Sequence, residues 1–233
     1  MDKLSSLSIF FPAFNEEKNI PIVLSQVLEL GLKIADKYEV IVVDDGSMDQ
    51  TAEVVRDFIK KHSNIKLIQH KENLGYGSAL KTGFYNSKFD YITYMDGDGQ
   101  FDFSEIVKLI LKMEEEKSDI AIGFRIKRQD RFVRVINGKL WNFLCSSLMG
   151  LRIRDIDCGF KLVKRKVIDD IPKLESSGAT ISAELLVKAK KKGFKISQVG
   201  LIHKDRLFGK ATGGNPLHIF RAFYDLFTIL PKV

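Results

Sequence analysis

Two aspartates separated by one residue follow a short apolar segment near the middle of the chain. The segment reads YITYM over residues 91–95, and Asp96 and Asp98 come directly after it in the sequence DGDGQ. Two like charges at the end of a buried strand repel each other and lose hydration, so we expect something to offset that cost. A bound cation, turn hydrogen bonds or exposure to water would do so. Mg²⁺ and Mn²⁺ prefer oxygen ligands, and Mg²⁺ is often held by one or two carboxylates plus substrate phosphates.

Similar polar clusters follow two other apolar segments. AFNEE comes after the segment at 8–11, and DDGS comes after the segment at 38–43. The polar residues after the three segments are Asn15, Glu16, Asp44, Asp45, Asp96 and Asp98. An Asp-x-Asp motif alone favours a turn. Because ligands of open α/β sheets bind beyond the carboxyl ends of the strands, this shared placement favours a metal site instead.

The elements that must position these residues alternate between strands and helices. Strands are predicted at 8–11, 38–43, 65–69, 91–95 and 119–123. Helices are predicted after Asn19, at 51–62, at 78–86 and after the pair Asp102 and Glu105, with Asn19 and that pair as caps. This alternation predicts an α/β fold with a mostly parallel sheet and helices on both faces.

The pattern loosens after residue 123. Helices are predicted at 133–149 and 182–192, an alternating strand at 194–199, and a glycine-containing loop at 203–215. The segment 217–233 has apolar residues at helical spacing, so it can lie on a membrane surface or pack on the domain. We expect one domain over residues 1–233, with an amphipathic helix at 217–233.

Composition narrows the class of protein. The chain has 233 residues, a net charge of +7 and two cysteines, Cys145 and Cys158, without metal-site spacing. Basic clusters at 125–134 and 161–166 suit phosphate groups, anionic lipids or nucleic acid. We set nucleic acid aside because aromatic–basic interleaving and a recognition-helix motif are missing. Apolar runs are too short for a signal peptide or a spanning helix, so we expect a cytoplasmic protein.

The common phosphate-binding loops are missing from the sequence. It contains neither G-x-x-x-x-G-K-[ST] nor a G-x-G-x-x-G that opens the first helix. A diphosphate bound at the acidic strand ends would need a metal ion and basic side chains for neutralisation. Lys204, Arg206 and Lys210 in the glycine-containing loop are the expected suppliers. His62 and His70 are expected at surface or edge positions.

Several motifs together resemble a known family. They are PAFNEE (12–17), VVDDGSMDQT (42–51), NLGYGSALKTG (73–83), YMDGDGQFD (94–102), GFR (123–125), RDIDCGFKLVKR (154–165) and HKDRLFGKATG (203–213). In this order they resemble family 2 glycosyltransferases, and more narrowly the dolichol-phosphate mannose synthase group with its bacterial polyprenyl-phosphate relatives. The resemblance covers nearly the whole chain. It implies a Rossmann-like GT-A fold and an inverting transfer from a GDP- or UDP-linked sugar. It also divides the single domain into a nucleotide-sugar-binding half (1–123), an acceptor-side half with the donor loop (124–216) and the C-terminal amphipathic helix (217–233).

The resemblance also assigns site residues. It implies donor binding by Pro12, Ala13, Asn15, Glu16, Asp44, Asp45, Asp96, Gly97, Gln100, Arg206 and Lys210. It implies a Mg²⁺ or Mn²⁺ ion at Asp96, Asp98 and Gln100, and contacts from Arg125 and Arg134 to an acceptor phosphate. The loop with His203 and Arg206 is expected to close over the donor.

The acceptor decides which further residues act in catalysis. The candidate catalytic residues are Asp98, Asp157 and Arg206. A phosphate monoester acceptor is already anionic and needs positioning, whereas a hydroxyl acceptor needs a general base. Asp157 is the candidate base and Asp155 the reserve, but a capping carboxylate paired with Lys161 or Arg154 explains Asp157 equally well.

Three functions therefore stay open. The first is transfer to a polyprenyl phosphate by an enzyme bound peripherally at the cytoplasmic face of the membrane, with or without a separate membrane protein partner. The second is transfer to a hydroxyl of a cell-envelope glycan, and the third is binding of a nucleotide sugar without catalysis.

Overall fold

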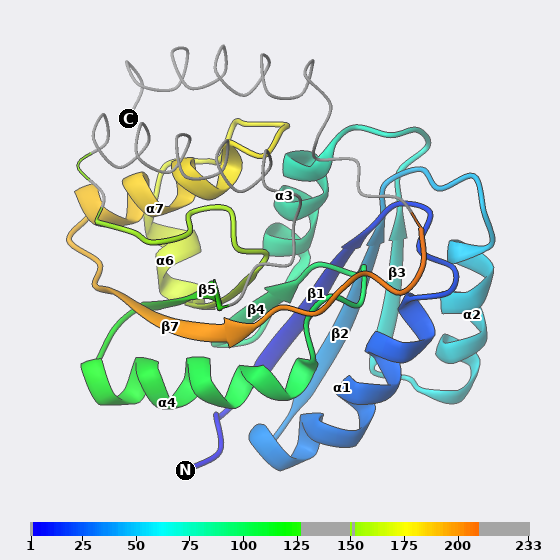
Figure 1. Cartoon of the computed structure of the whole chain (residues 1–233), viewed down its shortest axis with the longest axis horizontal. Helices are drawn as coiled ribbons and strands as arrows, with labels where there is room; N and C mark the ends of the chain where they lie inside the picture. Colours follow the sequence, from blue (N-terminus) through cyan, green and yellow to red (C-terminus); the bar gives the residue numbers. More distant parts are fainter. Residues whose placement is uncertain (1, 127–149, 151, 210–233) are drawn as a thin grey trace.

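The computed structural model describes residues 2–126, 150 and 152–209. In this part of the chain one sheet has seven strands in the order β3-β2-β1-β4-β6-β5-β7 (Figure 1). The strands are β1 (Leu7–Ala13), β2 (Tyr38–Asp44), β3 (Ile65–Gln69), β4 (Tyr91–Met95), β5 (Ile120–Ile126), β6 (Phe160–Lys164) and β7 (Ile196–Ile202). The helices are α1 (Ile20–Ile34), α2 (Thr51–Lys61), α3 (Tyr76–Asn86), α4 (Ile106–Glu116), α6 (Arg165–Asp170) and α7 (Ile181–Lys191), with a 3₁₀ turn η1 (Phe103–Glu105).

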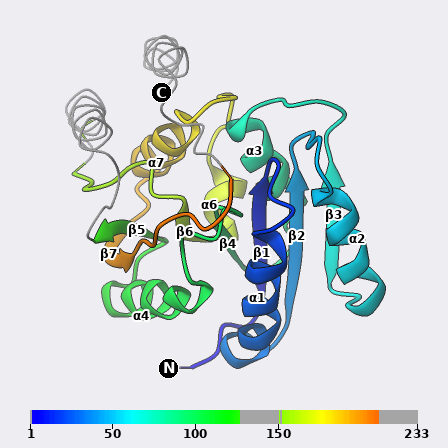
Figure 2. The same cartoon turned by 45° about the vertical axis from the view of Figure 1, so that its right-hand side comes forward.

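Strand β1 shows how the sheet is buried on both faces. Ile9 and Phe11 point into a core shared with α1, α2 and α4. Phe10, between them, points to the opposite core, which is formed with α3, α6 and α7. Figures 1 and 2 show these two helical layers on either side of the sheet. Since successive side chains of a strand face opposite ways, a continuous apolar run is what such a doubly covered strand requires.

Strand order explains why the acidic clusters meet. β1 pairs in parallel with β2 on one side and with β4 on the other. The carboxyl ends of these three strands therefore lie next to one another at one edge of the sheet. The predicted α/β fold with a mostly parallel sheet is confirmed, and so is the alternation through β5.

Strand β6 was not predicted. It lies between β4 and β5 and runs antiparallel to both. Its sequence is FKLVK, in which two lysines interrupt the apolar pattern. Lys161 is nevertheless fully buried. Because a lysine occupies a buried position, hydrophobic periodicity does not predict this short central strand.

Two predicted helix caps differ in the structure. The side chain of Asn19 makes no capping hydrogen bond, and its amide nitrogen donates to Glu16 instead. Asp102 does cap η1 by accepting from Ser104 N. Its expected partner Glu105 binds Lys108 and accepts from Ile202 N, so these two do not form a reciprocal pair.

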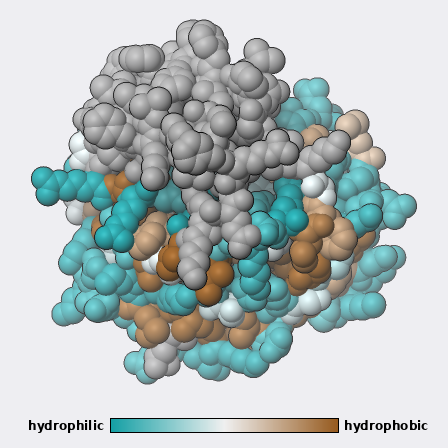
Figure 3. All heavy atoms as spheres, in the orientation of Figure 1, coloured by the Kyte–Doolittle hydropathy of each residue, from teal (hydrophilic) through white to brown (hydrophobic). Residues whose placement is uncertain are grey.

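Within the described ranges, no helix combines the length and apolar character that crossing a bilayer requires. Hydrophilic side chains surround small hydrophobic groups on the face drawn in Figure 3. Exposed apolar side chains include Leu111, Ile126 and Ile202. The expected helices at 133–149 and 217–233 lie outside the described residues.

Candidate active site

The acidic pair at the end of β4 is held by backbone contacts to the neighbouring strands. Asp96 N donates to Gly159 O at 3.0 Å, and Gly97 N donates to Pro12 O at 3.3 Å. The carboxylate of Asp96 lies against Gly159, where a Cβ atom would come within 1.9 Å of Oδ2. Only glycine fits at position 159 with Asp96 in this place. Gly159, directly before β6, thus leaves room for the Asp96 carboxylate.

The Asp96 carboxyl group has an unusual protonation equilibrium. Burial, and then the negative charge of Asp98, raise its pKa to about 7. Tyr76 donates a hydrogen bond of 2.8 Å from Oη to Oδ1 and works in the opposite direction. Burial and the nearby Asp96 carboxylate raise the pKa of Tyr76 well above its usual value, so the phenol stays a donor. A cation placed between Asp96 and Asp98 would relieve their repulsion.

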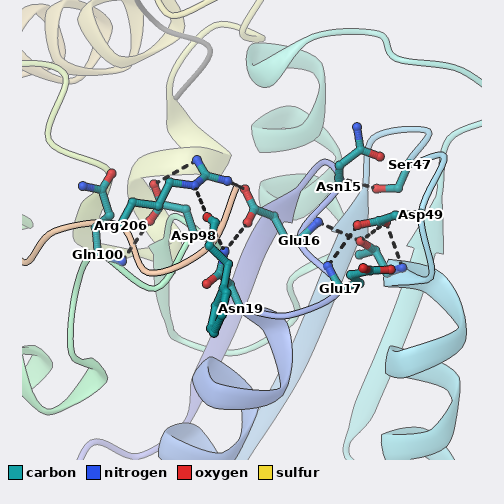
Figure 4. A network of polar contacts seen from close by, with 11 residues as sticks. Asn15, Glu16, Glu17, Asn19, Ser47, Asp49, Asp98, Gln100 and Arg206 are labelled. Atoms are coloured by element: carbon teal, nitrogen blue, oxygen red, sulfur yellow. Dashed lines mark hydrogen bonds and ion pairs between the residues drawn. The ribbon is translucent and has the colours of Figure 1, made fainter. Parts of the chain in front are cut away.

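The segment after β7 brings a guanidinium group to the same place. Arg206 forms ion pairs with Glu16 and with Asp98, the latter at 3.8 Å between Nη1 and Oδ2. Its Nε also donates to Phe208 O at 2.7 Å, which curls the loop around the side chain. Figure 4 shows Arg206 between the carboxylates of Glu16 and Asp98. Residues far apart in sequence therefore meet at this point.

Glu16 is held from its other side by Asn19. Asn19 Nδ2 donates to Glu16 Oε2 at 2.7 Å and to Phe208 O at 3.3 Å. Burial raises the pKa of Glu16, although the Asn19 hydrogen bond and the Arg206 charge oppose that shift. The amide that was expected to cap α1 instead ties the start of that helix to the 203–208 loop.

Gln100 joins the acidic pair to the same loop. Its backbone N donates to Asp98 Oδ1 at 3.1 Å. Its side-chain Nε2 donates to Lys204 O at 3.1 Å, and Lys204 N donates back to Gln100 O at 2.8 Å. The Lys204 ammonium group pairs with Asp102 at 3.0 Å, not with the acidic pair. The ring of His203 packs edge-on against Phe101, with centroids 5.0 Å apart. Lys210 lies outside the described residues.

The ends of β1 and β2 form a second corner of the site. Asn15 has a left-handed backbone with φ of 57°, and its Oδ1 accepts from Met48 N at 2.8 Å. Asparagine tolerates this conformation better than most residues do. The fully buried Asp44 carboxylate accepts from Ser47 N at 3.0 Å and from Gln69 Nε2 at 2.9 Å. Ala13, like Pro12, contributes to this corner through its backbone, since Asp45 N donates to Ala13 O at 2.8 Å.

Asp45 is occupied by contacts inside the protein. It accepts from Leu74 N at 3.0 Å and from Gly75 N at 2.9 Å, and it contacts His70 Nδ1 at 2.6 Å. The other ring nitrogen of His70 lies 2.9 Å from Thr82 Oγ1. His70 directly follows β3, an edge strand of the sheet, as expected, although its side chain is only 10% exposed. A histidine that bonds on both sides stabilises the 73–75 turn beside the site.

The predicted acceptor side is built around one ion pair. Arg125, near the end of β5, forms a bidentate pair with Asp155, with both N···O distances at 2.7 Å. Burial lowers the pKa of Arg125, but the Asp155 carboxylate outweighs it, so the net shift is upward. The pair fixes the direction of the guanidinium plane. It also commits Asp155, the reserve base, to Arg125. Arg134 lies outside the described residues.

Asp157 lies on the same side of the rim. Its carboxylate charge contributes to the raised pKa values of Tyr76, Arg125 and Lys161. The guanidinium group of Arg154, its alternative capping partner, stacks over the Phe124 ring at 4.8 Å. Tyr76, Gly159 and Lys161 were missed as contributors to the site. The motifs NLGYG and CGFK contain them, but nothing local marks their contacts with Asp96 or the 155–159 segment.

The donor set suits a hard divalent ion that shares its shell with a ligand. Among the described residues, no group of three or more His, Cys, Asp or Glu side chains converges on one point. The two carboxylates of Asp96 and Asp98, with Gln100 beside them, would hold such an ion only in part. This fits the chemistry of Mg²⁺ or Mn²⁺, which commonly completes its coordination with phosphates and water.

Fold and site together define the class of protein as a GT-A glycosyltransferase. The model of the family named glycosyl transferase family 2 matches residues 8–172, which is more than half of the chain. The chain therefore belongs to glycosyl transferase family 2, as the motifs predicted. The GT-A fold is confirmed as well. Glucosyl-3-phosphoglycerate synthase of Mycobacterium tuberculosis, solved with Mn²⁺, UDP and glucosyl-3-phosphoglycerate, has a TM-score of 0.74 at 20% identity, covering 96% of this chain and 79% of that one.

Relatives in sequence come from distant organisms. An uncharacterised protein of Methanocaldococcus jannaschii is 34% identical, over 79% of this chain and 82% of its own length. Dolichyl-phosphate beta-glucosyltransferase of Dictyostelium discoideum is 32% identical, over 84% of this chain and 65% of its own. Dodecaprenyl-phosphate galacturonate synthase of Rhizobium johnstonii is 26% identical, over 96% and 66%. The chain thus spans about two thirds of the two enzymes with named activities.

Proposed function

We propose that this glycosyltransferase is metal-dependent and inverting, and that it moves a sugar from a nucleoside diphosphate to a polyprenyl phosphate at the cytoplasmic face of a membrane. One observation carries the donor half of the proposal: Arg206 pairs with Asp98, in the acidic pair after β4, and with Glu16, after β1. The names of the polyprenyl-phosphate relatives support the acceptor half. The same acidic pair supports Mg²⁺ or Mn²⁺ as the cofactor.

The donor would bind across the two corners of the rim. Asp44 and Asn15 line the β1–β2 corner, where the nucleoside is proposed to lie. Asp96, Asp98 and Gln100 would hold the metal ion, which when bound neutralises charge on the diphosphate. Arg206 now pairs with Glu16 and Asp98. On donor binding we expect it to exchange these carboxylates for diphosphate oxygens, to which a guanidinium can bind in a bidentate manner.

The transfer step follows from the charges at the site. An oxygen of the acceptor phosphate forms a bond to the anomeric carbon, while the bond from that carbon to the diphosphate oxygen breaks and its electron pair leaves with the nucleoside diphosphate. Arg206 stabilises the charge that develops on the leaving group. The attacking oxygen is already anionic, so its orientation matters more than its deprotonation. Arg125, held in one direction by Asp155, is proposed to supply that orientation.

Thermal-shift and transfer assays test the proposal. Wild-type protein is heated with Mn²⁺ and with UDP or GDP sugars, since a ligand that binds only the folded state raises its apparent stability. The stabilising donor is then incubated with farnesyl phosphate, a short polyprenyl phosphate. We expect a glycolipid product whose formation stops in EDTA and returns when Mn²⁺ is added back in excess. Turnover that persists in EDTA would refute the metal role, and turnover only on hydroxyl acceptors would refute the acceptor assignment.

A further inference from the structure

A fully buried lysine on β6 takes no part in the mechanism above. Lys161 is 0% exposed, and its strand lies inside the sheet between β4 and β5. Burying an ammonium group has a large desolvation cost unless the surroundings compensate for it. A methionine would fill a similar volume without that cost. The contacts of the ammonium group therefore call for an explanation.

Those contacts tie Lys161 to the segment that runs into β6. Its Nζ donates to Cys158 O at 2.6 Å and lies 3.4 Å from Ser182 Oγ at the start of α7. It also lies 5.2 Å from the centre of the Tyr94 ring, a favourable place for a cation. Burial lowers the pKa of Lys161, but Tyr94, Cys158 and Asp157 outweigh it, so the net shift is upward and the group stays charged.

The anchored segment, residues 155–159, connects both halves of the proposed site. At its first residue, Asp155 holds Arg125 through two bonds of 2.7 Å. At its last residue, Gly159 accepts from Asp96 N at 3.0 Å and lies against the Asp96 carboxylate. In between, Cys158 packs against Gly123 of β5, where a Cβ atom would lie 3.0 Å from its Sγ. A shift of this segment would move Arg125 through Asp155, whereas the acidic pair is also held from β1, where Gly97 N donates to Pro12 O at 3.3 Å.

We propose that Lys161 is a positioning residue for the transfer reaction: its buried ammonium group fixes the 155–159 segment, and through Asp155 it sets the direction of the acceptor-binding Arg125. The inference rests on the proposed function for the role of Arg125. The contacts of the proposed metal ligands depend less on the Lys161 ammonium group. Asp98 accepts from Gln100 N, and the Gln100 side chain donates to Lys204 O, which lies outside the anchored segment. We therefore expect loss of the Lys161 contacts to raise the KM for the acceptor more than the KM for the donor.

The test compares Lys161→Met with a matched control, Lys188→Met. Lys188 is also buried, at 4% exposure, and its ammonium group pairs with Glu184 and with Lys173 O, both at 2.6 Å, on α7 and the loop before it. Both variants lose a buried charge, but only the first loses the contact to Cys158. Lys161→Gln is the second variant, since it keeps a hydrogen-bond donor and gives a folded protein if the methionine variant does not fold.

Two readouts are taken on each protein. Hydrogen–deuterium exchange of the peptide covering 155–160 should rise by about tenfold or more in Lys161→Met and stay at the wild-type rate in Lys188→Met. With Mn²⁺ and the stabilising donor, the KM for farnesyl phosphate should rise by about tenfold or more in Lys161→Met, with the donor KM within about threefold, because misplacement of about 1 Å can change rates a hundredfold. Lys188→Met should lower only the melting temperature.

The outcomes separate the inference from the proposed function. Wild-type exchange in Lys161→Met, or equal changes in donor and acceptor KM, would overturn the positioning role. Faster exchange together with a wild-type protein that transfers no sugar to farnesyl phosphate would refute the proposed function and still support anchoring by Lys161.

Discussion

The donor and acceptor sides of the site are built in different ways. On the donor side, short polar clusters directly follow β1, β2 and β4, and parallel pairing brings them together. On the acceptor side, Arg125 depends on Asp155, thirty residues later, and on a strand that runs against its neighbours. The donor side repeats one local pattern, a strand followed by polar residues. The acceptor side depends on individual contacts between residues far apart in sequence. We therefore expect substitutions on the donor side to abolish metal and nucleotide binding. Substitutions on the acceptor side should instead misalign the acceptor phosphate.

The largest effect is expected at the acidic pair. Asp98→Asn removes one of the two carboxylates proposed to hold the metal ion and one partner of Arg206. We expect kcat to fall by about a thousandfold or more and Mn²⁺-dependent nucleotide binding to weaken, as measured by turnover assays and calorimetry.

Asp102→Asn is the control for that variant, because Asp102 caps η1 and pairs with Lys204 at 3.0 Å instead of facing the acidic pair. Its turnover should remain close to that of the wild type. Activity in Asp98→Asn that matches this control would contradict the donor-side assignment.

The second effect is expected on the acceptor side. Arg125→Lys keeps the charge but loses the planar, two-pronged pairing with Asp155. We expect the KM for farnesyl phosphate to rise by about tenfold to a hundredfold, while the donor KM stays within about threefold. Steady-state kinetics with each substrate varied in turn measure both. A defect confined to the donor would reverse the comparison between the two sides.

The donor side could be predicted from sequence because its information is local. An apolar run followed by Asn, Asp or Gly marks both the strand and its polar end, and parallel strands carry those ends to one edge. Asp96, Asp98, Asn15 and Asp44 were found in this way. The sequence indicated Arg206 as a source of positive charge at the site, but its pairing with Glu16 was not predicted, since no spacing rule relates residues so far apart.

On the acceptor side the family resemblance named Arg125, but strand β6 and the buried lysine on it were not predicted, for physical reasons. Lys161 makes β6 look like a surface segment, and only the finished fold supplies the Cys158 carbonyl and the Tyr94 ring around its ammonium group. The contacts of His70 with Asp45 and Thr82 were likewise not predicted, because they depend on the folded arrangement. Burial of a polar side chain depends on partners, and partners are set by tertiary structure.

A third, intermediate effect concerns stability. Asp96 has a folded-state pKa of about 7, against about 3.9 for an unfolded aspartate. Between these values the folded state holds more protons than the unfolded state, so the free energy of unfolding of metal-free protein should fall as pH rises from 4 to 7. Asp96→Asn removes that loss. We expect it to be more stable than wild type at pH 8 by about 1–3 kcal/mol, and inactive.

Urea unfolding of metal-free protein between pH 5 and pH 8 measures this effect. The stability advantage of Asp96→Asn should shrink toward pH 5, where wild-type Asp96 is protonated. Asp57→Asn, at an exposed position on α2, is the control and should gain no such advantage at pH 8. A constant difference across the range would show that Asp96 is ionised in the folded state throughout.

The smallest effect is expected at Asp157, and it separates the two acceptor chemistries. With a phosphate acceptor no general base is needed, so Asp157→Asn should lower kcat by about fivefold or less and leave the shape of the pH–rate profile unchanged. A hundredfold loss, accompanied by disappearance of the acidic limb of that profile, would instead identify a carboxylate that removes a proton from a hydroxyl. Because the Asp157 charge acts on Tyr76, Arg125 and Lys161, a modest loss also fits its surroundings. The acidic limb is therefore the decisive measurement: positioning by neighbouring charges changes the height of the profile, whereas general-base catalysis sets its acidic edge.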